Sequence, residues 1–189
     1  MASIRTFIAF APPSNVREDI YYFLENLKTS KADVKWDTVD KLHVTMTFLG
    51  NVAEVDMHNV IACVKNCCAS SRVFHVTYSK LGTFPNKKHP KVIWLGCEEP
   101  TGTLYSFKQH IDRALAPLGF TPDDRHFHPH ITFGRVRSEK GIANLLSIME
   151  NLIIEPRTAT VENILVMKSE LHREGAAYSI IESIQLPSA

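Results

Sequence analysis

A short motif occurs twice in this chain. Residues His43–Phe48 have the sequence HVTMTF, and residues His130–Phe133 have the sequence HITF. In a β-strand, residues two apart point to the same face of the sheet. Each copy therefore places a histidine and a threonine side by side on one face and turns its branched apolar residue to the other, into a core. Two such strands in one compact chain predict a cleft that two histidines face.

Size and composition indicate a soluble globular protein. The chain has 189 residues, for which one domain or two closely fused lobes are expected. Its 44% hydrophobic and 22% charged residues argue against long disordered segments. The formal net charge of +1 excludes a strong electrostatic grip on long nucleic acid, which needs many Lys and Arg on one face. A short or mononucleotide-sized anion needs only a few local cations.

We expect a cytoplasmic protein that does not associate with a membrane. Residues Met1–Phe10 contain no apolar h-region followed by a small-residue cleavage site, so no signal peptide is expected. No apolar run approaches the roughly 20 residues that span a bilayer. The cysteines lack the spacing of a zinc finger, and we expect them to form a small apolar surface in a reducing compartment. They are Cys63, Cys67, Cys68 and Cys97.

Hydrophobic periodicity predicts an α+β protein. Helical patterns occur at residues 14–29, 55–70, 104–118 and 141–151, and Ser14 or Asn15 is expected to cap the first. Strand patterns occur at residues 4–10, 34–36, 43–49, 73–81, 92–97, 127–133, 160–167 and 178–186. Loops are predicted at residues 50–51, 85–90, 121–125 and 172–175. These elements form two similar series without a linker, so we expect two related lobes, each with an antiparallel sheet, and a groove between them.

Two histidines across a cleft suit acid–base chemistry at phosphorus. The ordinary pKa of histidine, about 6.5, lets its side chain give or take a proton near neutral pH. One imidazole can remove a proton from the attacking water or hydroxyl, while the other protonates the departing oxygen. The adjacent threonine hydroxyls can donate hydrogen bonds to the non-bridging phosphate oxygens. No metal is required when the leaving oxygen is protonated directly and the diester is strained, as in a 2',3'-cyclic phosphate.

A metal site is the alternative at the second motif. His126, His128 and His130 alternate and could share one strand face, and zinc sites do use three histidines. Pro129 disturbs regular strand pairing there, and no carboxylate cluster is evident. We therefore expect no metal and no cofactor, with His128 facing the core or His126 capping a turn.

The two motifs resemble the signature motifs of a known family. The strings HVTMTFLG at His43–Gly50 and FHPHITFGR at Phe127–Arg135 are similar to those of the 2H phosphoesterase superfamily. They resemble more narrowly the RNA 2',3'-cyclic phosphodiesterases, also named 2'-5' RNA ligases. Further blocks match in order along almost the whole chain, at Arg5–Phe10, Gly82–Pro85, Val92–Gly96, Ala116–Phe120, Met167–Leu171 and Gly175–Tyr178.

The resemblance implies a fold, a reaction and partners. It implies one bilobal domain over residues 1–189 with pseudo-twofold symmetry, two antiparallel sheets lining a central cleft and helices on the outer faces. It also implies metal-independent hydrolysis of RNA or nucleoside 2',3'-cyclic phosphates to 2'-phosphates. The expected partners are RNA with such ends or cyclic nucleotides, and we expect a monomer.

Carried over residue by residue, the resemblance assigns roles to four side chains. His43 would be the general acid that protonates the leaving 3'-oxygen. His130 would be the general base that activates water. Thr45 and Thr132 would hold the phosphate oxygens.

Phe48 and Arg135 match positions that the family uses near the nucleotide. Strict strand alternation turns both away from their histidines, so each needs a bulge, a strand end or a twist to reach the cleft. Core packing of Phe48 and a surface ion pair of Arg135 are equally compatible with the sequence.

Two other functions remain open. A nucleotide-binding module of the same fold with little catalysis would need only the threonine pair and a few basic groups, although it has no need of two proton-transfer groups. The enzyme could also join a cyclic-phosphate end to a 5'-hydroxyl through a 2'-5' linkage. Water at about 55 M outcompetes a dilute hydroxyl, so ligation is expected to be a side activity.

Overall fold

The fold is built on one curled antiparallel sheet. The computed structural model describes residues 2–122, 126–172 and 175–188. Within these ranges the strand order is β7–β4–β5–β6–β3–β1–β8–β9, and the short strand β2 pairs with β6. The strands are β1 Ser3–Phe10, β2 Val34–Trp36, β3 Val44–Ala53, β4 Phe74–Phe84, β5 Val92–Glu98, β6 His130–Val136, β7 Arg157–Val161, β8 Asn163–His172 and β9 Gly175–Gln185. The α-helices are α1 Ser14–Lys28, α2 Met57–Ala69, α3 Thr103–Leu115 and α4 Ile142–Asn151.

The sheet has two halves that meet at the two motif strands. One half contains β1, β3, β8 and β9, and the other contains β2, β4, β5, β6 and β7. In the described part of the chain, the strands β3 and β6 pair only through Val44 and Ile131, whose side chains are fully buried. The predicted α+β fold, with antiparallel sheets around a cleft and helices outside, is confirmed. The two predicted sheets are halves of one continuous sheet.

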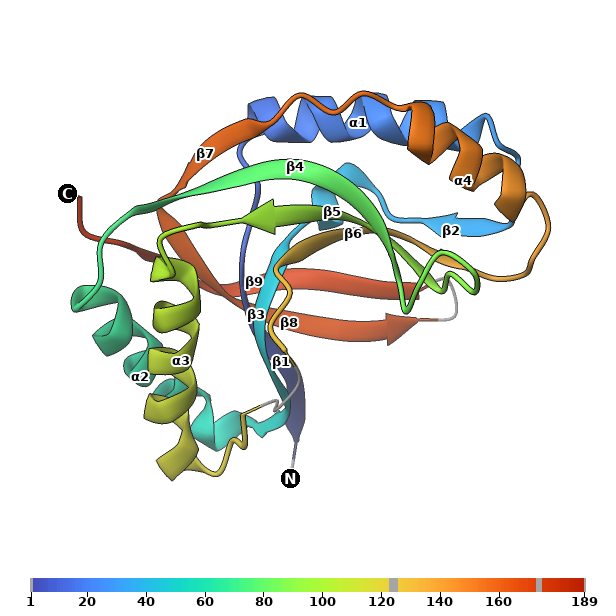
Figure 1. Ribbon diagram of the computed structural model, residues 1–189. Helices are drawn as coiled ribbons and strands as arrows, with labels where there is room; N and C mark the ends of the chain where they lie inside the picture. Colours follow the sequence, from blue (N-terminus) through green and yellow to red (C-terminus); the bar gives the residue numbers. More distant parts are fainter. Residues whose placement is uncertain (1, 123–125, 173–174, 189) are drawn as a thin grey trace.

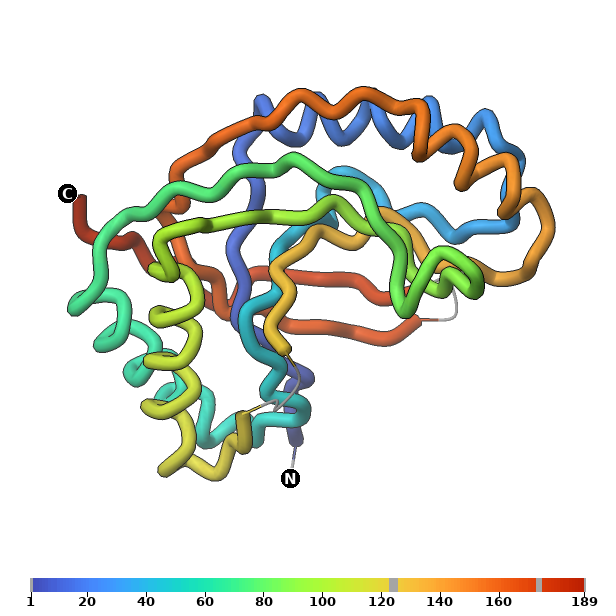
Figure 2. Tube along the Cα trace, in the orientation of Figure 1, coloured from blue at the N-terminus to red at the C-terminus, as the bar shows by residue number. Residues whose placement is uncertain are grey.

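The four α-helices of the described residues lie outside the sheet in two pairs. Helix α1 lies beside α4, and α2 lies beside α3 (Figures 1 and 2). Each helix turns an apolar stripe inward because its apolar residues recur every three or four positions. The buried residues of α1 are Val16, Ile20, Phe23, Leu24 and Leu27. Within the described ranges, no helix is both long and apolar enough to cross a membrane.

Strand β1 is buried on both faces. Ile8 and Phe10 point into the main core, which the helices cover. Phe7 and Ala9 point to the other face and form a small second cluster with Met167 and its neighbours. A central strand with apolar residues on both faces is expected when both sides of the sheet are covered or line a site. The second cluster forms the apolar floor beneath the first motif.

The cysteines pack as the sequence predicts. Cys67, Cys68 and Cys97 are buried, Cys63 is partly buried, and all four are free thiols. Burial raises the pKa of the Cys67 thiol to about 11 and that of Cys68 to about 12. These thiols are therefore protonated and serve as small apolar groups.

Several predicted boundaries are wrong. The strand predicted at residues 160–167 is two strands, because the chain passes at Glu162 from one half of the sheet to the other: β7 pairs with β4, and β8 pairs with β1. The strand after His43 continues past Gly50 to Ala53, because β1 pairs with it along this length. Helix α1 has Pro13 at its N-cap position and no side-chain cap. The loops predicted at residues 121–125 and 172–175 fall partly outside the described residues.

Candidate active site

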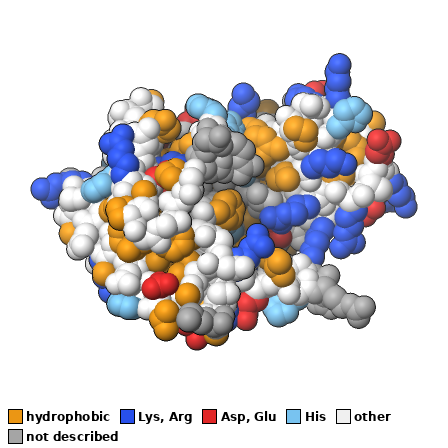
Figure 3. Space-filling model, turned by 90° about the horizontal axis from the view of Figure 1, so that it is seen from below, with side chains coloured by type: hydrophobic (Ala, Val, Ile, Leu, Met, Phe, Trp, Pro, Cys, Tyr) orange, Lys and Arg blue, Asp and Glu red, His pale blue; other side chains and the backbone are white. Residues whose placement is uncertain are grey.

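One cleft between the two halves of the sheet brings together all six side chains that the sequence singled out. These are His43, Thr45, Phe48, His130, Thr132 and Arg135. The cleft has a volume of about 1060 Å³, at the upper end of the usual size of ligand sites. Its lining is also basic, with Arg5, Lys35, Lys41 and Lys108. A group of Lys and Arg side chains is visible near the middle of the face in Figure 3.

The two histidines are held in the same way. His43 Nδ1 lies 2.7 Å from the carbonyl oxygen of Lys41. His130 Nδ1 lies 2.7 Å from the carbonyl oxygen of His128. A carbonyl oxygen can only accept a hydrogen bond, so the Nδ1 of each ring carries a proton and donates it. The Nε2 of each ring is therefore the nitrogen that can exchange a proton with a ligand.

Aromatic side chains fix the orientation of both imidazoles. The His43 ring packs against Phe7, with centroids 4.8 Å apart, and edge-on against Tyr178, with centroids 4.9 Å apart. The His130 ring packs edge-on against Phe84, with centroids 4.9 Å apart. Each motif strand therefore presents its histidine in a single, packed orientation.

Burial lowers the pKa of both histidines below the ordinary value. For His43, loss of solvent is the largest cause; its carbonyl hydrogen bond and the charge of Asp37 oppose it, while Arg135 and His130 add to it. For His130, loss of solvent is again the largest cause, and the neighbouring His128 adds to it. Because His130 lowers the pKa of His43, protonation of one ring disfavours protonation of the other.

A β-bulge turns Phe48 into the cleft. Two consecutive residues of β3, Met46 and Thr47, lie opposite the single residue Ile8 of β1. The extra residue shifts the strand alternation by one, and Phe48 returns to the face of Thr45. The Phe48 side chain is 62% exposed, which excludes core packing.

The second motif contains the equivalent bulge. Phe133 is an extra residue in β6, because Gly134 pairs with Ile93 while Thr132 pairs with the next residue of β5. Arg135 therefore returns to the cleft face that carries Thr132. Phe48 and Arg135 each lie three positions after a motif threonine, so the two bulges act alike in the two halves.

An ion pair holds Arg135 at the cleft. Its Nη1 lies 2.9 Å from Oδ2 of Asp37, and the side chain of Asp37 is only 16% exposed. The Asp37 N–H donates to the carbonyl oxygen of Phe133, with the nitrogen and oxygen 2.7 Å apart. The sequence was compatible with either an ion pair of Arg135 or a place in the cleft, and Arg135 has both.

Sequence reasoning missed several residues that shape the site. Phe7, Asp37, Phe84 and Tyr178 all contact a motif residue and line the cleft. They come from four separate segments, and none has a local pattern that indicates chemistry. The signals available were the family-like blocks around Phe7, Phe84 and Tyr178.

The three histidines of the second motif do not gather into a cluster in the described residues. Within the described ranges, no three His, Cys, Asp or Glu side chains lie close enough together to hold a metal ion. His128 instead packs edge-on against Trp94, with centroids 4.7 Å apart. The prediction that His128 faces the core is wrong, because its side chain is exposed and lines the cleft, as does that of His126.

Comparison with known proteins bears out the resemblance inferred from the motifs. A sequence model of the family described as the 2'-5' RNA ligase superfamily matches residues 12–173. A protein of Methanothermobacter thermautotrophicus named RNA 2',3'-cyclic phosphodiesterase is 28% identical over 97% of this chain and 99% of its own length. A protein of Methanocaldococcus jannaschii with the same name is 29% identical over 95% of this chain and 99% of its own length.

Solved structures share the fold. The crystal structure of TT0787 of Thermus thermophilus is similar with a TM-score of 0.82 and 22% identity, over 98% of this chain and 99% of that one. The crystal structure of Escherichia coli LigT complexed with 3'-AMP is similar with a TM-score of 0.77 and 23% identity, over 98% of this chain and 99% of that one.

Proposed function

This chain belongs to the 2'-5' RNA ligase superfamily, and from that membership we propose that it is an RNA 2',3'-cyclic phosphodiesterase. It hydrolyses the 2',3'-cyclic phosphate of RNA ends or nucleosides to a 2'-phosphate. The observation that carries the proposal is the matched pair of histidines in one cleft, each with Nδ1 bonded to a carbonyl and each with a threonine beside it. Relatives with this activity in their names match nearly the full chain.

The two histidines divide the proton transfers between them. His130, neutral at Nε2, takes a proton from the attacking water as the new P–O bond forms. His43, protonated at Nε2, gives a proton to the 3'-oxygen as the P–O3' bond breaks. The product keeps its phosphate on the 2'-oxygen. The next turnover requires His130 to lose its proton and His43 to regain one.

The remaining site residues bind the substrate. Thr45 and Thr132 donate hydrogen bonds to the non-bridging oxygens, where negative charge accumulates in the transition state. Phe48 presents an exposed ring on which a base can stack. Arg135 supplies a guanidinium for the anionic nucleotide. The solved complex of LigT with 3'-AMP shows that a protein of this fold takes a nucleotide.

The reaction as proposed needs no metal and no cofactor. Direct protonation of the leaving oxygen and the strain of the five-membered ring replace Lewis-acid activation. Joining the cyclic phosphate to a 5'-hydroxyl uses the same acid and base and is proposed as a minor activity. Since both halves of the sheet contribute to the cleft, we also propose that residues 1–189 act as one bilobal domain and that the monomer is active.

Phosphorus NMR tests the proposal directly. The purified protein is incubated with each of the four nucleoside 2',3'-cyclic phosphates, and the products are identified by their chemical shifts. We expect the corresponding 2'-phosphates. Formation of 3'-phosphates would contradict the assignment of the acid and the base. Tight binding of a mononucleotide by calorimetry, without product after long incubation, would instead favour a nucleotide-binding module.

A further inference from the structure

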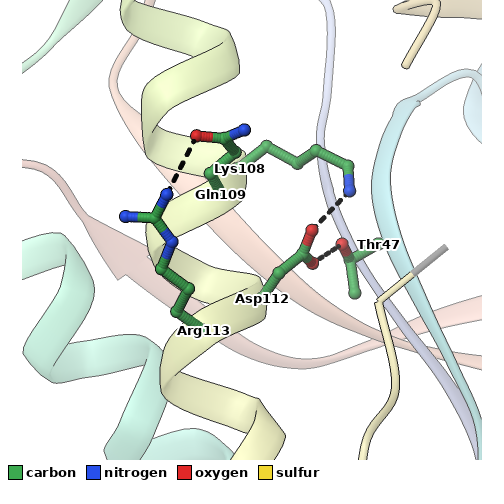
Figure 4. Close-up of polar contacts among 5 residues, drawn as sticks. All are labelled: Thr47, Lys108, Gln109, Asp112 and Arg113. Carbon is green, nitrogen blue, oxygen red and sulfur yellow. Dashed lines mark hydrogen bonds and ion pairs between the residues drawn. The ribbon is translucent and has the colours of Figure 1, made fainter. Parts of the chain in front are cut away.

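A buried polar network connects helix α3 to the first motif. The hydroxyl of Thr47 donates a hydrogen bond to Oδ1 of Asp112, and the ammonium group of Lys108 bonds to Oδ2 of the same carboxylate (Figure 4). Lys108 and Asp112 are each 7% exposed. Lys108 lies one helical turn before Asp112, so its ion pair orients the carboxylate and leaves Oδ1 for Thr47.

The position of Thr47 in the bulge gives this hydrogen bond a specific consequence. Thr47 is opposite Ile8, whose side chain lies in the core that the helices cover, and Met46 is buried in the same core. Two consecutive residues of β3 are therefore drawn toward the helices, which a regular strand does not allow. The next residue, Phe48, must point to the cleft. The bond to Asp112 thus holds Thr47, the bulge residue that directly precedes Phe48. The orientation of Thr47 in turn sets the face to which Phe48 points.

The edge of β3 is open at this place. In the described residues, its pairing with β6 is confined to Val44, so backbone hydrogen bonds across that edge do not hold the strand at Thr47. Lys108 of α3 lies at this edge, with its ammonium 5.7 Å from the centre of the ring of Phe127 in the segment before β6, and both residues line the cleft together with Thr47. The side-chain network therefore supplies a restraint that pairing with β6 does not.

The second bulge is restrained differently. Its equivalent of Thr47 is Gly134, which pairs with Trp36 of β2. A Cβ at Gly134 would lie 2.7 Å from Cγ1 of Val34, so strand packing itself fixes this bulge. Gly134 has no side chain that could bond to a helix. Of these two bulges, only the one in β3 is therefore held by a side-chain hydrogen bond to a helix.

We propose that Thr47 and Asp112 are positioning residues that hold Phe48 on the cleft face and thereby set recognition of the nucleobase. The inference rests on the proposed function, in which Phe48 stacks on the base. Neither residue takes part in proton transfer. Their loss should weaken recognition of the base while the reaction at phosphorus is retained.

The test compares two substrates in four proteins. The substrates are adenosine 2',3'-cyclic phosphate and methyl riboside 2',3'-cyclic phosphate, which has no base. The proteins are wild type, Thr47→Val, Phe48→Ala and the double variant. We expect both single variants to raise KM for the adenosine substrate by about threefold to tenfold, with kcat changed by less than about twofold. KM for the base-free substrate should stay unchanged, and the double variant should match Phe48→Ala.

Matched variants separate positioning from general damage. Thr47→Ser keeps the hydroxyl and should restore the wild-type KM. Thr77→Val removes a hydroxyl from a threonine pair on the exposed side of β4, where Thr77 Oγ1 lies 2.9 Å from Thr158 Oγ1. This control should change neither KM. Asp112→Asn keeps an acceptor for Thr47 but loses the ion pair, and we expect an intermediate KM.

An NMR measurement decides the inference independently of activity. The rings of Phe7 and Phe48 lie with centroids 6.0 Å apart, so nuclear Overhauser effects are expected between their ring protons. These signals should weaken or vanish in Thr47→Val and persist in Thr47→Ser. Unchanged signals in Thr47→Val, or an equal rise of KM for both substrates, would overturn the inference. Absence of turnover in wild type would instead overturn the proposed function and leave the NMR result to decide the positioning role.

Discussion

Val44 of β3 pairs with Ile131 of β6, and each is the residue that directly follows a motif histidine. Both side chains are fully buried, so the flanking residues of both strands face the cleft. The antiparallel register of this pair directs His43 toward Thr132 and His130 toward Thr45. An approximate twofold axis therefore passes between Val44 and Ile131, and it relates two identical His-Thr units around one site.

Replacing either histidine should abolish most turnover. We expect His43→Ala and His130→Ala each to lower kcat by about 10²-fold to 10⁴-fold, the usual contribution of a general acid or base. His75→Ala is the matched control, because His75 is exposed on β4 and bonds to Thr160. Steady-state hydrolysis of a nucleoside 2',3'-cyclic phosphate measures the effect. Substantial activity in His130→Ala would refute the paired mechanism.

The pH dependence of kcat/KM should be bell-shaped, with its maximum on the acid side of the ordinary histidine pKa. The rate falls below the pKa of the base, which must be neutral, and above the pKa of the acid, which must be charged. Burial lowers the pKa of both histidines, so both limbs move to lower pH. Rates measured over a pH series at constant ionic strength give the profile. A maximum well above about pH 7 would contradict this assignment.

Chelators should not inhibit the reaction. Protonation by His43 and hydrogen bonds from Thr45 and Thr132 serve the leaving and non-bridging oxygens in the proposed mechanism. The rate of protein dialysed against EDTA is compared with that of untreated protein. An activity lost on dialysis and restored by zinc or magnesium would show that a metal ion is required.

The ion pair of Arg135 and Asp37 should tune the pKa of His43 in opposite directions. Arg135 lowers this pKa and Asp37 raises it. Arg135→Gln should therefore raise the pKa of His43, and Asp37→Asn should lower it. Titration of the imidazole signals by NMR measures both shifts.

A second ion pair offers the control for that titration. Arg157 Nε lies 2.8 Å from Oδ2 of Asp19, and neither residue lines the cleft. Arg157→Gln should leave the titration of His43 unchanged. Equal shifts in Arg135→Gln and Arg157→Gln would mean that the change reflects net charge rather than this contact.

Gly134→Ala should destabilise the fold. The added Cβ would lie 2.7 Å from Cγ1 of Val34 and 2.9 Å from Cε3 of Trp36, so these side chains or β2 itself must shift. Overpacking of this kind costs about 1–3 kcal/mol of the free energy of unfolding. Urea denaturation measures the loss. An unchanged free energy of unfolding would mean that β2 moves aside freely and does not fix the second bulge.

Local pattern predicted most of the secondary structure. The helices and strands appear where apolar residues recur with the corresponding period, because that period decides which side chains can be buried. The split of residues 160–167 into β7 and β8 was not predictable, since no Gly or Pro lies beside Glu162 to mark a break between strands. The break follows from long-range pairing, because β7 pairs with β4 and β8 pairs with β1.

Alternation within a strand is a local property, so the motifs alone place His43 and Thr45 on one face and His130 and Thr132 on another. The meeting of these two faces in one cleft depends on long-range strand pairing, through the pair Val44–Ile131. Long-range strand pairing also places Phe48 and Arg135 in this cleft. A bulge is an extra residue relative to the neighbouring strand, so its position depends on β1 and β5 rather than on the motifs themselves.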